Sequence, residues 1–596
     1  MIYIILLIFG TFYYRLQIHH LFGGDSPEYS VVSRTWSIPH PPGYPLYSLL
    51  LNLIRILFPF VPEYIRNNLF SIIPTLLTAL IIYKTLEMLL KNRTIALAAI
   101  IFYLSLFPVW LYAEVPEIFA INNLIISLII YSVLRYRKSG KNRYRYLCFL
   151  LIGLGAAHHQ TFIFFLPGLI FLIGNKRWEF VKNGFLRNIA MALLGFSFYI
   201  YAPIASFFRP PIDWEYASSL AGFIRLVTRS SYGTFQAYAG SVPNLINQMA
   251  DLLSACLFLL QDFKPLGIIF IFLGLYFMHK KAGNFFRYVL TTLIIYIFFL
   301  FISDFSIDNN FISATYERFM IAFYLILVFP FAFGLKFFFD KYESIVIKYI
   351  ANTQLKLLTK VVLYVFIAAI IGIGFHESLV KISTVPHINQ FDEYAKNLLA
   401  TPEPQAIVAI NGDLSYFTSS YYYTAQKYRS DLKIIFIGLL SRDYYNNYIK
   451  SKYPGVIIPS DQNYDVAKKN FILKNSGRYS LFFERPDDVG KGLWVPYGFF
   501  WKYYPNNIND KEVDHIVEIN DYLWDHLYHI PTLKTNDKNI LYLSDLQMNY
   551  LNTLYTYTRF LQYHMKISDV KRYLALILSY DSNYLQAKND LQKLSR

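Results

Sequence analysis

Hydrophobic residues form long, nearly uninterrupted runs over the larger part of the chain and are mixed with polar residues after residue 376. A helix needs about 20 consecutive apolar residues to cross a bilayer. The runs predict eleven membrane-spanning helices and a shorter, proline-bounded helix at 44–60. The expected spans are 2–18, 68–90, 94–112, 118–134, 146–157, 161–174, 188–204, 252–277, 288–303, 318–335 and 361–375. The pattern therefore predicts a membrane domain over residues 1–376.

The remaining chain reads as a soluble tail in two parts. A predicted strand, Ala406–Ile410, ends in Asn411-Gly412-Asp413, and a Tyr-rich helical stretch leads to a second strand at Leu432–Leu440. Alternating strands and helices predict an α/β domain over 377–542. From 543 to 596 the pattern is helical, and one junction there is similar to a tetratricopeptide repeat. The predicted fold class is an α-helical polytopic membrane protein with a C-terminal α/β domain that ends in helices.

Basic residues orient the predicted spans. The loops 84–93, 135–145, 175–187, 279–287 and 336–360 together hold 21 Lys and Arg, whereas the opposite segments 20–43, 113–117, 205–250 and 304–317 hold only Arg34, Arg209, Arg225 and Arg229. Positive loops stay on the cytoplasmic side. The N-terminus is therefore expected inside, and an odd number of spans places the tail outside.

Composition supports the same class. Charged residues make up 16% of the chain, below the roughly 25% of soluble domains. The net charge of +16 is explained by the cytoplasmic loops, so no nucleic-acid partner is expected. Cys148 and Cys256 are the only cysteines and lie in apolar runs, which excludes a disulfide framework and a CxxC metal site.

The first outer segment carries two carboxylates three residues apart, Asp25 and Glu28. If this segment is helical they share one face, and either can act as a general base. The alternative is that they only cap a short helix at the membrane surface. In the proline-rich string that follows, the prolines fix the shape of the loop. His40 is the candidate for substrate binding there.

Further candidates lie at outer span ends. Glu114 follows one span directly and Glu117 precedes the next. Carboxylates so close to hydrocarbon are costly and functional by default, although an interfacial Glu can simply reach water. His158 and His159, between two apolar runs, can donate to a phosphate or a sugar hydroxyl. No cofactor is required by these residues, no metal ligands are assigned, and a divalent metal is compatible with the histidines.

Arg318 is expected at the start of the tenth span, after an acidic and polar outer loop. Its guanidinium is a permanently charged, forked donor that suits a phosphate. The alternative is an interfacial anchor whose charge reaches the water.

These motifs, in this order, resemble a known family. The motifs are Gly24-Asp25-x-x-Glu28, the string from His40 to Tyr47, Ala113-Glu114-Val115, Gly155-x-x-His158-His159-x-Thr161 and Pro211-x-x-Trp214. The resemblance is to a bacterial family of membrane proteins of the glycosyltransferase-C superfamily, related to the eukaryotic lumenal transmembrane protein O-mannosyltransferases. It covers most of residues 20–335 and extends to the Gly-Asp pair at Gly412-Asp413. Two departures, Pro116 and Arg209, bear on the acceptor more than on the reaction type.

The resemblance implies a glycosyltransferase that takes a sugar, mannose by analogy, from a polyprenyl-phosphate donor to a protein or glycan hydroxyl on the extracytoplasmic face. Asp25 matches the catalytic base of the family. Glu28 and Glu114 would support the base or the acceptor, and His159 and Arg318 would hold the lipid phosphate. The implied location is a bacterial cytoplasmic membrane.

Two other functions remain open at this point. A transporter or flippase of lipid-linked sugars also needs a polar cavity between helices, but the chain lacks a convincing two-fold repeat. A scaffold whose tail recruits partners is consistent with the helical end, but it leaves the acidic residues of the outer loops without a role.

Overall fold

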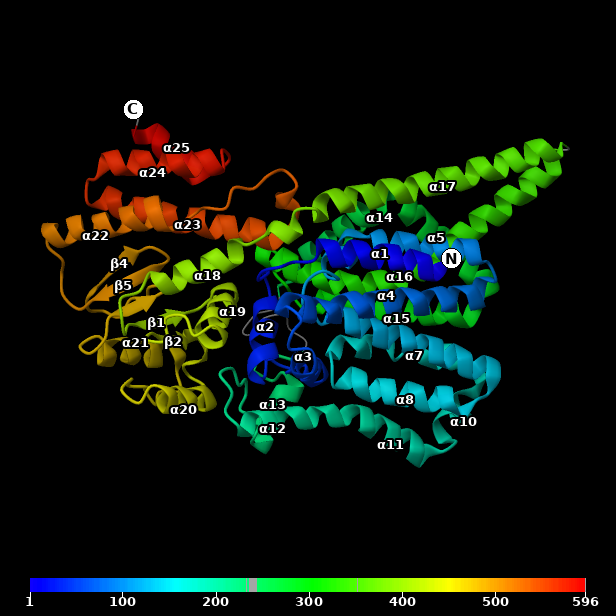
Figure 1. Ribbon diagram of the computed structural model, residues 1–596, viewed down its shortest axis with the longest axis horizontal. Coiled ribbons are helices and arrows are strands. Elements are labelled where there is room, and N and C mark those ends of the chain that lie inside the picture. The colour runs from blue at the N-terminus through cyan, green and yellow to red at the C-terminus, as the bar shows by residue number, and fades with distance from the viewer. Residues whose placement is uncertain (232, 235–243, 351, 595–596) are drawn as a thin grey trace. The chain divides into compact units, whose positions relative to one another are not determined.

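The structure is a computed structural model that describes residues 1–231, 233–234, 244–350 and 352–594. It contains two compact units (Figure 1). Unit 1 comprises Met1–His19 and Val32–His387, and unit 2 comprises His20–Val31 and Ile388–Arg596. The division falls inside helix α2 (Ser26–Thr35), after Val31. The predicted domain border at 376 falls inside the last long helix of unit 1.

Unit 1 is helical. Besides the second half of α2, its helices are α1 (Ile2–Leu16), α3 (Pro45–Leu57), α4 (Glu63–Leu90), α5 (Arg93–Ser105), α6 (Phe107–Leu111), α7 (Phe119–Ser139), α8 (Asn142–Ala156), α9 (Leu169–Ile173), α10 (Arg177–Lys182), α11 (Phe185–Phe196), α12 (Tyr201–Phe207), α13 (Leu220–Thr228), α14 (Leu245–Lys281), α15 (Gly283–Ile302), α16 (Asn310–Tyr349) and α17 (Thr353–Ile382). Short 3-10 turns lie at Gln160–Phe165 (η1), Gly174–Lys176, Ser197–Ile200 (η3) and Val385–His387.

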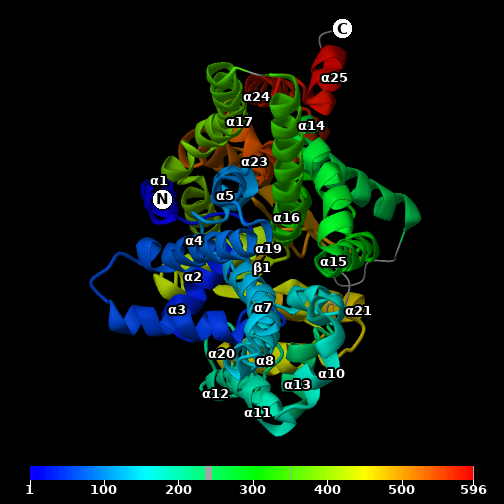
Figure 2. The same ribbon diagram turned by 90° about the vertical axis from the view of Figure 1, so that its right-hand side faces the viewer.

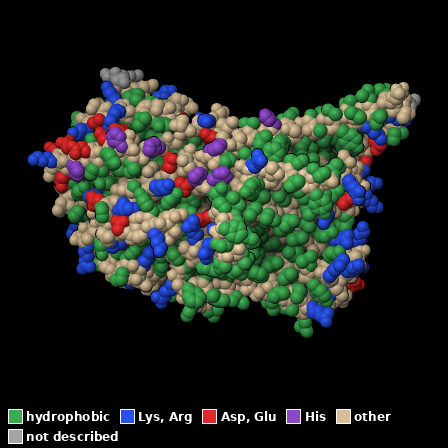
Figure 3. Space-filling view, in the orientation of Figure 1, with side chains coloured by type: hydrophobic (Ala, Val, Ile, Leu, Met, Phe, Trp, Pro, Cys, Tyr) green, Lys and Arg blue, Asp and Glu red, His purple; other side chains and the backbone are tan. Residues whose placement is uncertain are grey.

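Seven helical segments of the described chain are long and apolar enough to cross a membrane: Glu63–Leu90, Phe119–Ser139, Phe185–Phe207, Leu245–Lys281, Gly283–Ile302, Asn310–Tyr349 and Thr353–Ala400. Helices α1, α3 and α5 are apolar but shorter. Hydrophobic side chains cover most of the visible face of unit 1, and Lys and Arg gather at the end where α7 turns into α8 (Figures 1 and 3). The structure confirms a helical polytopic membrane protein, but not the count of eleven spans.

Several predicted spans differ from the observed helices, and the span 94–112 is divided at Leu106 into α5 and α6. The segment 161–174 is broken into η1 and α9, because Pro167 cannot donate a backbone hydrogen bond and disfavours a helical residue before it. The predicted span 318–335 is part of α16, which begins eight residues earlier, at Asn310. Arg318 therefore lies inside a helix instead of at its start, and the polar outer loop is shorter than expected.

Asparagine side chains cap the first turns of several helices in unit 1. The side-chain oxygens of Asn92, Asn244, Asn309 and Asn352 accept backbone N–H groups in the first turns of α5, α14, α16 and α17. These bonds satisfy donors that a helix start leaves without partners. Helix α14 kinks at Lys264, which precedes Pro265 and has a φ of 59°. Helices α14 and α16 lie side by side (Figures 1 and 2).

Unit 2 is built on one five-stranded sheet with the strand order β2-β1-β3-β5-β4. The strands are β1 (Ile407–Ile410), β2 (Lys433–Phe436), β3 (Leu481–Phe483), β4 (Leu493–Tyr497) and β5 (Phe500–Tyr504). Strand β1 is parallel to β2 and β3, whereas β5 is antiparallel to β3 and β4. All four residues of β1 are buried, as expected for a strand between parallel neighbours.

Helices of unit 2 complete this arrangement. They are α18 (Gln390–Ala400), α19 (Asp413–Ser420), α20 (Asp443–Lys452), α21 (Tyr464–Asn475), α22 (Asp510–Tyr522), α23 (Leu541–Tyr563), α24 (Ile567–Tyr580) and α25 (Leu585–Leu594). Short π-helical turns occur at Tyr421–Ala425 (η5) and Leu523–Leu527, and a 3-10 turn at Asp537–Asn539.

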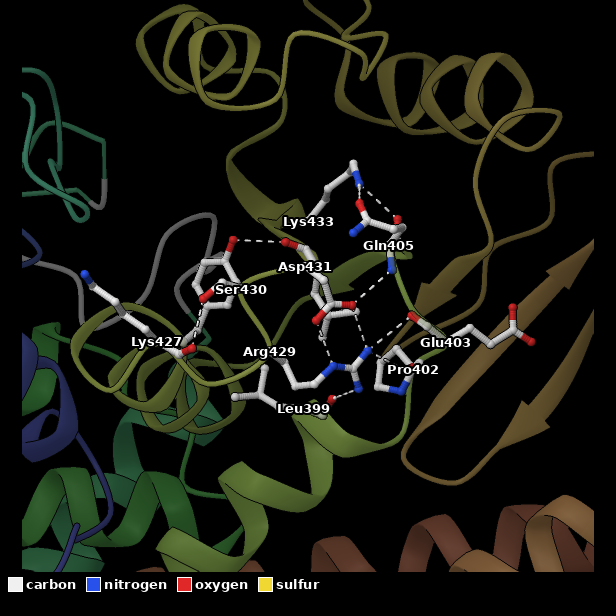
Figure 4. A network of polar contacts seen from close by, with 11 residues as sticks. Leu399, Pro402, Glu403, Gln405, Lys427, Arg429, Ser430, Asp431 and Lys433 are labelled. Atoms are coloured by element: carbon white, nitrogen blue, oxygen red, sulfur yellow. Dashed lines mark hydrogen bonds and ion pairs between the residues drawn. The ribbon is translucent and has the colours of Figure 1, made fainter.

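A polar network fixes the turn before β2 (Figure 4). Arg429 donates to the carbonyls of Leu399 and Pro402 at 2.9 and 3.1 Å, and to the carboxylate of Asp431 at 2.9 and 3.1 Å. The hydrogen bonds from Arg429 lower the pKa of Asp431 to about 2. The end of α18 is thereby tied to the start of β2.

Candidate functional site

His159 is held in one orientation by the turn that follows α8. The backbone N–H of Thr161 points at His159 Nδ1 from 3.4 Å, and the Thr161 hydroxyl lies 2.5 Å from the same atom. Asn122 of α7 donates to that hydroxyl at 3.4 Å. Because Nδ1 accepts, the proton of the neutral imidazole lies on Nε2. His159 thus presents a hydrogen-bond donor that is available to an anion.

His158 has a different environment. Its Nε2 lies 2.8 Å from the carbonyl oxygen of Ile118, which can only accept, so Nε2 carries the proton. The other ring nitrogen, Nδ1, is buried and makes no hydrogen bond within the described residues. His158 joins the turn after α8 to the start of α7. It therefore fixes the position of its neighbour His159.

The proline-rich loop lies against this turn. Tyr44 stacks on His159 with ring centroids 5.8 Å apart and an interplanar angle of 10°, and its hydroxyl lies 3.0 Å from His40 Nε2. The backbone N–H of Leu46 donates to the carbonyl of Ala157 at 3.1 Å. Gly43, at a φ of +83°, allows the tight turn and the close approach of Leu226 from α13. His40 and His159 are thereby brought to one place.

Arg318 and Glu117 form a buried ion pair. Arg318 donates to the Glu117 carboxylate at 2.8 Å, and the two side chains are 4% and 0% exposed. Ser71 of α4 bonds to the backbone of Glu117 and holds it in place. Such burial excludes the interpretation of Arg318 as an anchor that reaches water.

Glu114 is also fully buried. One carboxylate oxygen accepts from the indole N–H of Trp110 at 2.6 Å, and the other has no hydrogen-bond partner among the described residues. The interpretation of Glu114 as an interfacial residue in water is therefore wrong. A buried carboxylate oxygen without a partner is costly and fits a site that receives a polar ligand.

Four cationic or basic groups are close enough to His159 to act on it electrostatically. They are His158, Arg229, His40 and Arg318. Two of them are arginines with permanent charge, and Arg318 also lies 5.9 Å from the ring of Phe119, which itself contacts His159. We call His40, His159, Arg229 and Arg318 the cationic cluster. It can hold an anion such as a phosphate.

Sequence reasoning missed Arg229 as a site residue. Its position follows from α13, whose Val227 carbonyl accepts from Gln160, next to His159. A signal was present, because Arg229 is one of four arginines in outer segments that hold no lysine and no other arginine. Of the other three, Arg34 pairs with Glu63 and Arg225 pairs with Glu215.

Asp25 and Glu28 belong to unit 2 and are described with it. Helix α2 begins at Ser26, and the carbonyl of Asp25 accepts from the backbone N–H of Tyr29 at 3.2 Å. Asp25 therefore directly precedes the helix, and Glu28 lies in its first turn. Both the capping interpretation and the base interpretation fit these positions. Asp25 is partly exposed, whereas Glu28 is fully buried.

No group of three or more His, Cys, Asp or Glu side chains in the described part of the chain is arranged to hold a metal ion.

Comparisons with known proteins bear on this site. Residues 25–182 match the Protein O-mannosyl-transferase TMEM260 N-terminal domain, a stretch that includes every predicted site residue except Arg318. The predicted resemblance is confirmed. Protein O-mannosyl-transferase TMEM260 of Mus musculus is 22% identical over 468 residues, which are 74% of this chain and 63% of that protein. The Dictyostelium discoideum protein of the same name is 22% identical over 507 residues, 79% of this chain and 61% of its own length.

The chain thus matches less than two thirds of the length of these curated relatives. Among solved structures, apo ArnT from Cupriavidus metallidurans aligns with a TM-score of 0.50 at 13% identity, over 84% of this chain and 96% of ArnT. The same enzyme bound to undecaprenyl phosphate aligns with a TM-score of 0.49 at 12% identity, over the same shares. The likeness to apo ArnT supports a fold of the glycosyltransferase-C type.

Proposed function

We propose that the protein transfers a sugar, mannose by analogy with its relatives, from a polyprenyl-phosphate donor to a hydroxyl of a protein or glycan. The observation that carries this proposal is the cationic cluster, of which His40 and His159 lie in the region that resembles O-mannosyltransferases. A lipid phosphate is the leaving group of such a reaction, and it gains charge as the sugar departs. Fixed cations in a site shielded from water stabilise that charge best.

An apolar cavity in unit 1, which also carries the cluster, supports a lipid-linked donor. It measures about 750 Å³ and is lined mainly by apolar side chains, among them Trp36, Leu49, Phe198, Tyr201 and Ile204. That volume lies within the usual range of ligand sites, roughly 300–1,000 Å³.

The wall of this cavity is connected to the proline-rich loop. Tyr201 donates to the carbonyl of Ser37 at 3.0 Å, and Tyr199 donates to the carbonyl of Pro42 at 3.3 Å. The loop between these carbonyls carries His40 of the cationic cluster. An isoprenoid chain in the cavity and a phosphate on the cluster would therefore fit one molecule with an apolar tail and an anionic head.

The proposed reaction is a direct displacement. The acceptor hydroxyl oxygen forms a bond to the anomeric carbon, and the bond from that carbon to the phosphate oxygen breaks. The electron pair of this bond leaves with the lipid phosphate, which Arg318, Arg229 and the Nε2–H of His159 hold. Asp25 takes the hydroxyl proton. Glu28 and Glu114 support the base and the acceptor.

The positive loops support an orientation with the α7–α8 connection in the cytoplasm, and with the reaction and unit 2 on the opposite side. We place the protein in a bacterial cytoplasmic membrane, following the family resemblance of the sequence motifs.

The test is release of polyprenyl phosphate from radiolabelled polyprenyl-phosphate mannose by the purified full chain, with a panel of protein and glycan acceptors. We expect Asp25→Asn to slow release by roughly 10²–10⁴-fold, the range of a lost general base. Asp308→Asn, an exposed acid in an outer loop, is the control and should leave release unchanged. Wild-type turnover in Asp25→Asn would remove Asp25 as the base. No release by the wild type would favour transport of the lipid-linked sugar.

A further inference from the structure

Unit 2 holds the chain segment that precedes the proposed base. Asp392, on α18, is 371 residues away from Leu21 in sequence, yet its carboxylate accepts the backbone N–H of Leu21 at 3.2 Å. The same carboxylate lies 3.0 Å from His20 Nδ1. Its other oxygen accepts the hydroxyl of Tyr422 at 2.7 Å, which keeps the carboxylate in place. Asp392 is only 7% exposed, so these contacts form in a site largely shielded from water.

Tyr542, at the start of α23, makes a second contact with this segment. A Cβ atom on Gly23 would overlap the Cβ of Tyr542, and one on Gly24 would lie 2.7 Å from the Tyr542 hydroxyl. Gly24 also has a φ of +72°, which only glycine adopts without strain. The two glycines are therefore needed for the chain to pass under the Tyr542 ring. They stand immediately before Asp25.

Phe22 and Glu28 interact with other parts of unit 2 on either side of these glycines. Phe22 is fully buried, with its ring centroid 5.8 Å from that of Phe391 and 6.0 Å from that of Tyr542. Beyond Asp25, burial and then the charge of Glu28 raise the pKa of Tyr416 on α19. Contacts from α18 and α23 therefore lie before Asp25, and beyond it the charge of Glu28 acts on Tyr416 of α19, all within unit 2.

None of these contacts involves the Asp25 carboxylate, yet together they fix the backbone that carries it. A base must lie within hydrogen-bond distance of the proton that it removes, and a displacement of about 1 Å can cost roughly 100-fold in rate. A loop with two adjacent glycines would have many conformations if nothing held it.

We infer that unit 2 fixes the conformation of the His20–Glu28 segment, and that Asp392 and Tyr542 are positioning residues for the base at Asp25. This inference rests on the proposed function for its kinetic consequence. It assigns a role to the C-terminal unit, whose α18 and α23 hold a loop from the other end of the sequence.

The first experiment measures how firmly unit 2 holds the His20–Glu28 segment, without any assay of activity. In the purified full chain, hydrogen exchange of peptides that cover residues 20–31 is compared between wild type, Asp392→Ala and Tyr542→Ala. We expect exchange there to become at least tenfold faster in both variants, while peptides from β1 and β3 keep their protection. The control Glu393→Gln changes the neighbouring residue of α18, whose carboxylate accepts from Asn389 instead. Unchanged exchange at 20–31 in both alanine variants would overturn the inference.

The second experiment measures polyprenyl-phosphate release with the same variants. A positioning role predicts that kcat falls by roughly 10–100-fold while the KM for the lipid donor changes less than twofold. Tyr542→Phe keeps the ring over Gly23 and Gly24, so it should retain turnover that Tyr542→Ala loses. Asp392 and Tyr542 lie on different helices, so their variants are independent tests. If one variant does not fold, the other still tests the inference.

The two experiments separate two kinds of failure. If the wild type releases no polyprenyl phosphate, the proposed function is wrong, and hydrogen exchange still decides whether unit 2 holds the segment. If the wild type is active and both alanine variants keep its kcat, the positioning role is wrong and the proposed function stands.

Discussion

Arg318 and Glu117 form a buried pair, so the proposed role of Arg318 in binding has to be separated from its role in folding. Both side chains are buried and they contact each other at 2.8 Å. Removing one member of such a pair leaves a buried charge without compensation, which costs about 3–5 kcal/mol, whereas replacing both members by neutral side chains is often nearly neutral. A single substitution of Arg318 therefore mixes a loss of stability with any loss of binding.

A double variant separates these two effects. We expect Arg318→Gln alone to lower the melting temperature in detergent, and Arg318→Met combined with Glu117→Gln to regain most of it. Turnover of the lipid donor in the double variant should stay roughly 10²–10³-fold below wild type, because a donor to the leaving phosphate is missing. Wild-type turnover in the double variant would instead mean that Arg318 only neutralises Glu117.

For single residues, the sequence predicted which residue types lie at the site better than it predicted their hydrogen-bond partners. His40, His159 and Arg318 are predicted at the outer side, and in the structure Tyr44 contacts both His40 and His159 while Phe119 contacts both His159 and Arg318. That His158 bonds to the Ile118 carbonyl while His159 bonds to Thr161 depends on the three-dimensional turn, which adjacent histidines do not reveal. The roles of Asp25 and Glu28 stay a prediction.

Among the elements, glycines set how closely the membrane helices approach. Gly274 of α14 lies against the carbonyl of Pro330 in α16, and Gly334 of α16 lies against the carbonyl of Phe270 in α14. Helices α8 and α11 repeat this arrangement, with Gly153 against Ala192 and Gly195 against Leu150, again through backbone carbonyls. Small residues at a helix crossing let backbones pack directly, which is the main source of association in a bilayer.

A substitution of Gly274 tests the close packing of α14 and α16. A Cβ there would overlap the Pro330 carbonyl, so we expect Gly274→Ala to force α14 and α16 apart and to cost about 1–3 kcal/mol, the range for an overpacked core. Gly374→Ala in α17 is the matched control, because its Cβ would meet no heavy atom within 4 Å. Thermal unfolding in detergent measures both. Equal melting temperatures for the two variants would contradict the close contact.

Apolar runs predicted where helices occur but not where they end. The run 161–174 is as apolar as its neighbours, yet Pro167 and Gly168 break it, and Gly168 lies against Tyr288 of α15. Helix α16 extends beyond its apolar run at both ends, because the Asn309 side chain caps it and polar residues can continue a helix outside hydrocarbon. Hydropathy detects contact with lipid, which is only one of the reasons for a helix to form.

For the whole molecule, the feature that the sequence could not reveal is the assignment of residues 20–31 to unit 2. Hydropathy divides the chain by position, so it groups this segment with the spans that flank it. The contact between Leu21 and Asp392 joins residues 371 apart, and no local pattern carries information about such a pair. A unit composed of two distant pieces of chain has to be read from the fold.

Membrane orientation is the prediction that concerns the whole molecule. The basic loops predict that the α7–α8 connection lies in the cytoplasm, and the proposed reaction requires unit 2 to lie outside. The chain is well suited to cysteine labelling, because it has only two cysteines, buried Cys148 and exposed Cys256, and both can be replaced by alanine. In that background a single cysteine is introduced at Lys141, before α8, or at Lys511, in α22; both positions are exposed.

We expect a membrane-impermeant maleimide to label Lys511→Cys in intact spheroplasts and Lys141→Cys only after the membrane is opened. The contrast follows from the positive-inside rule, since Lys141 lies in the loop 135–145, which holds six Lys and Arg residues. As a control, both introduced cysteines should be labelled at equal rates after the membrane is opened, which shows that they are equally reactive. If Lys511→Cys reacted only after opening, the number of crossings before residue 388 would be even and unit 2 would lie in the cytoplasm. A base in residues 20–31, which belong to unit 2, could then not act on an extracytoplasmic acceptor.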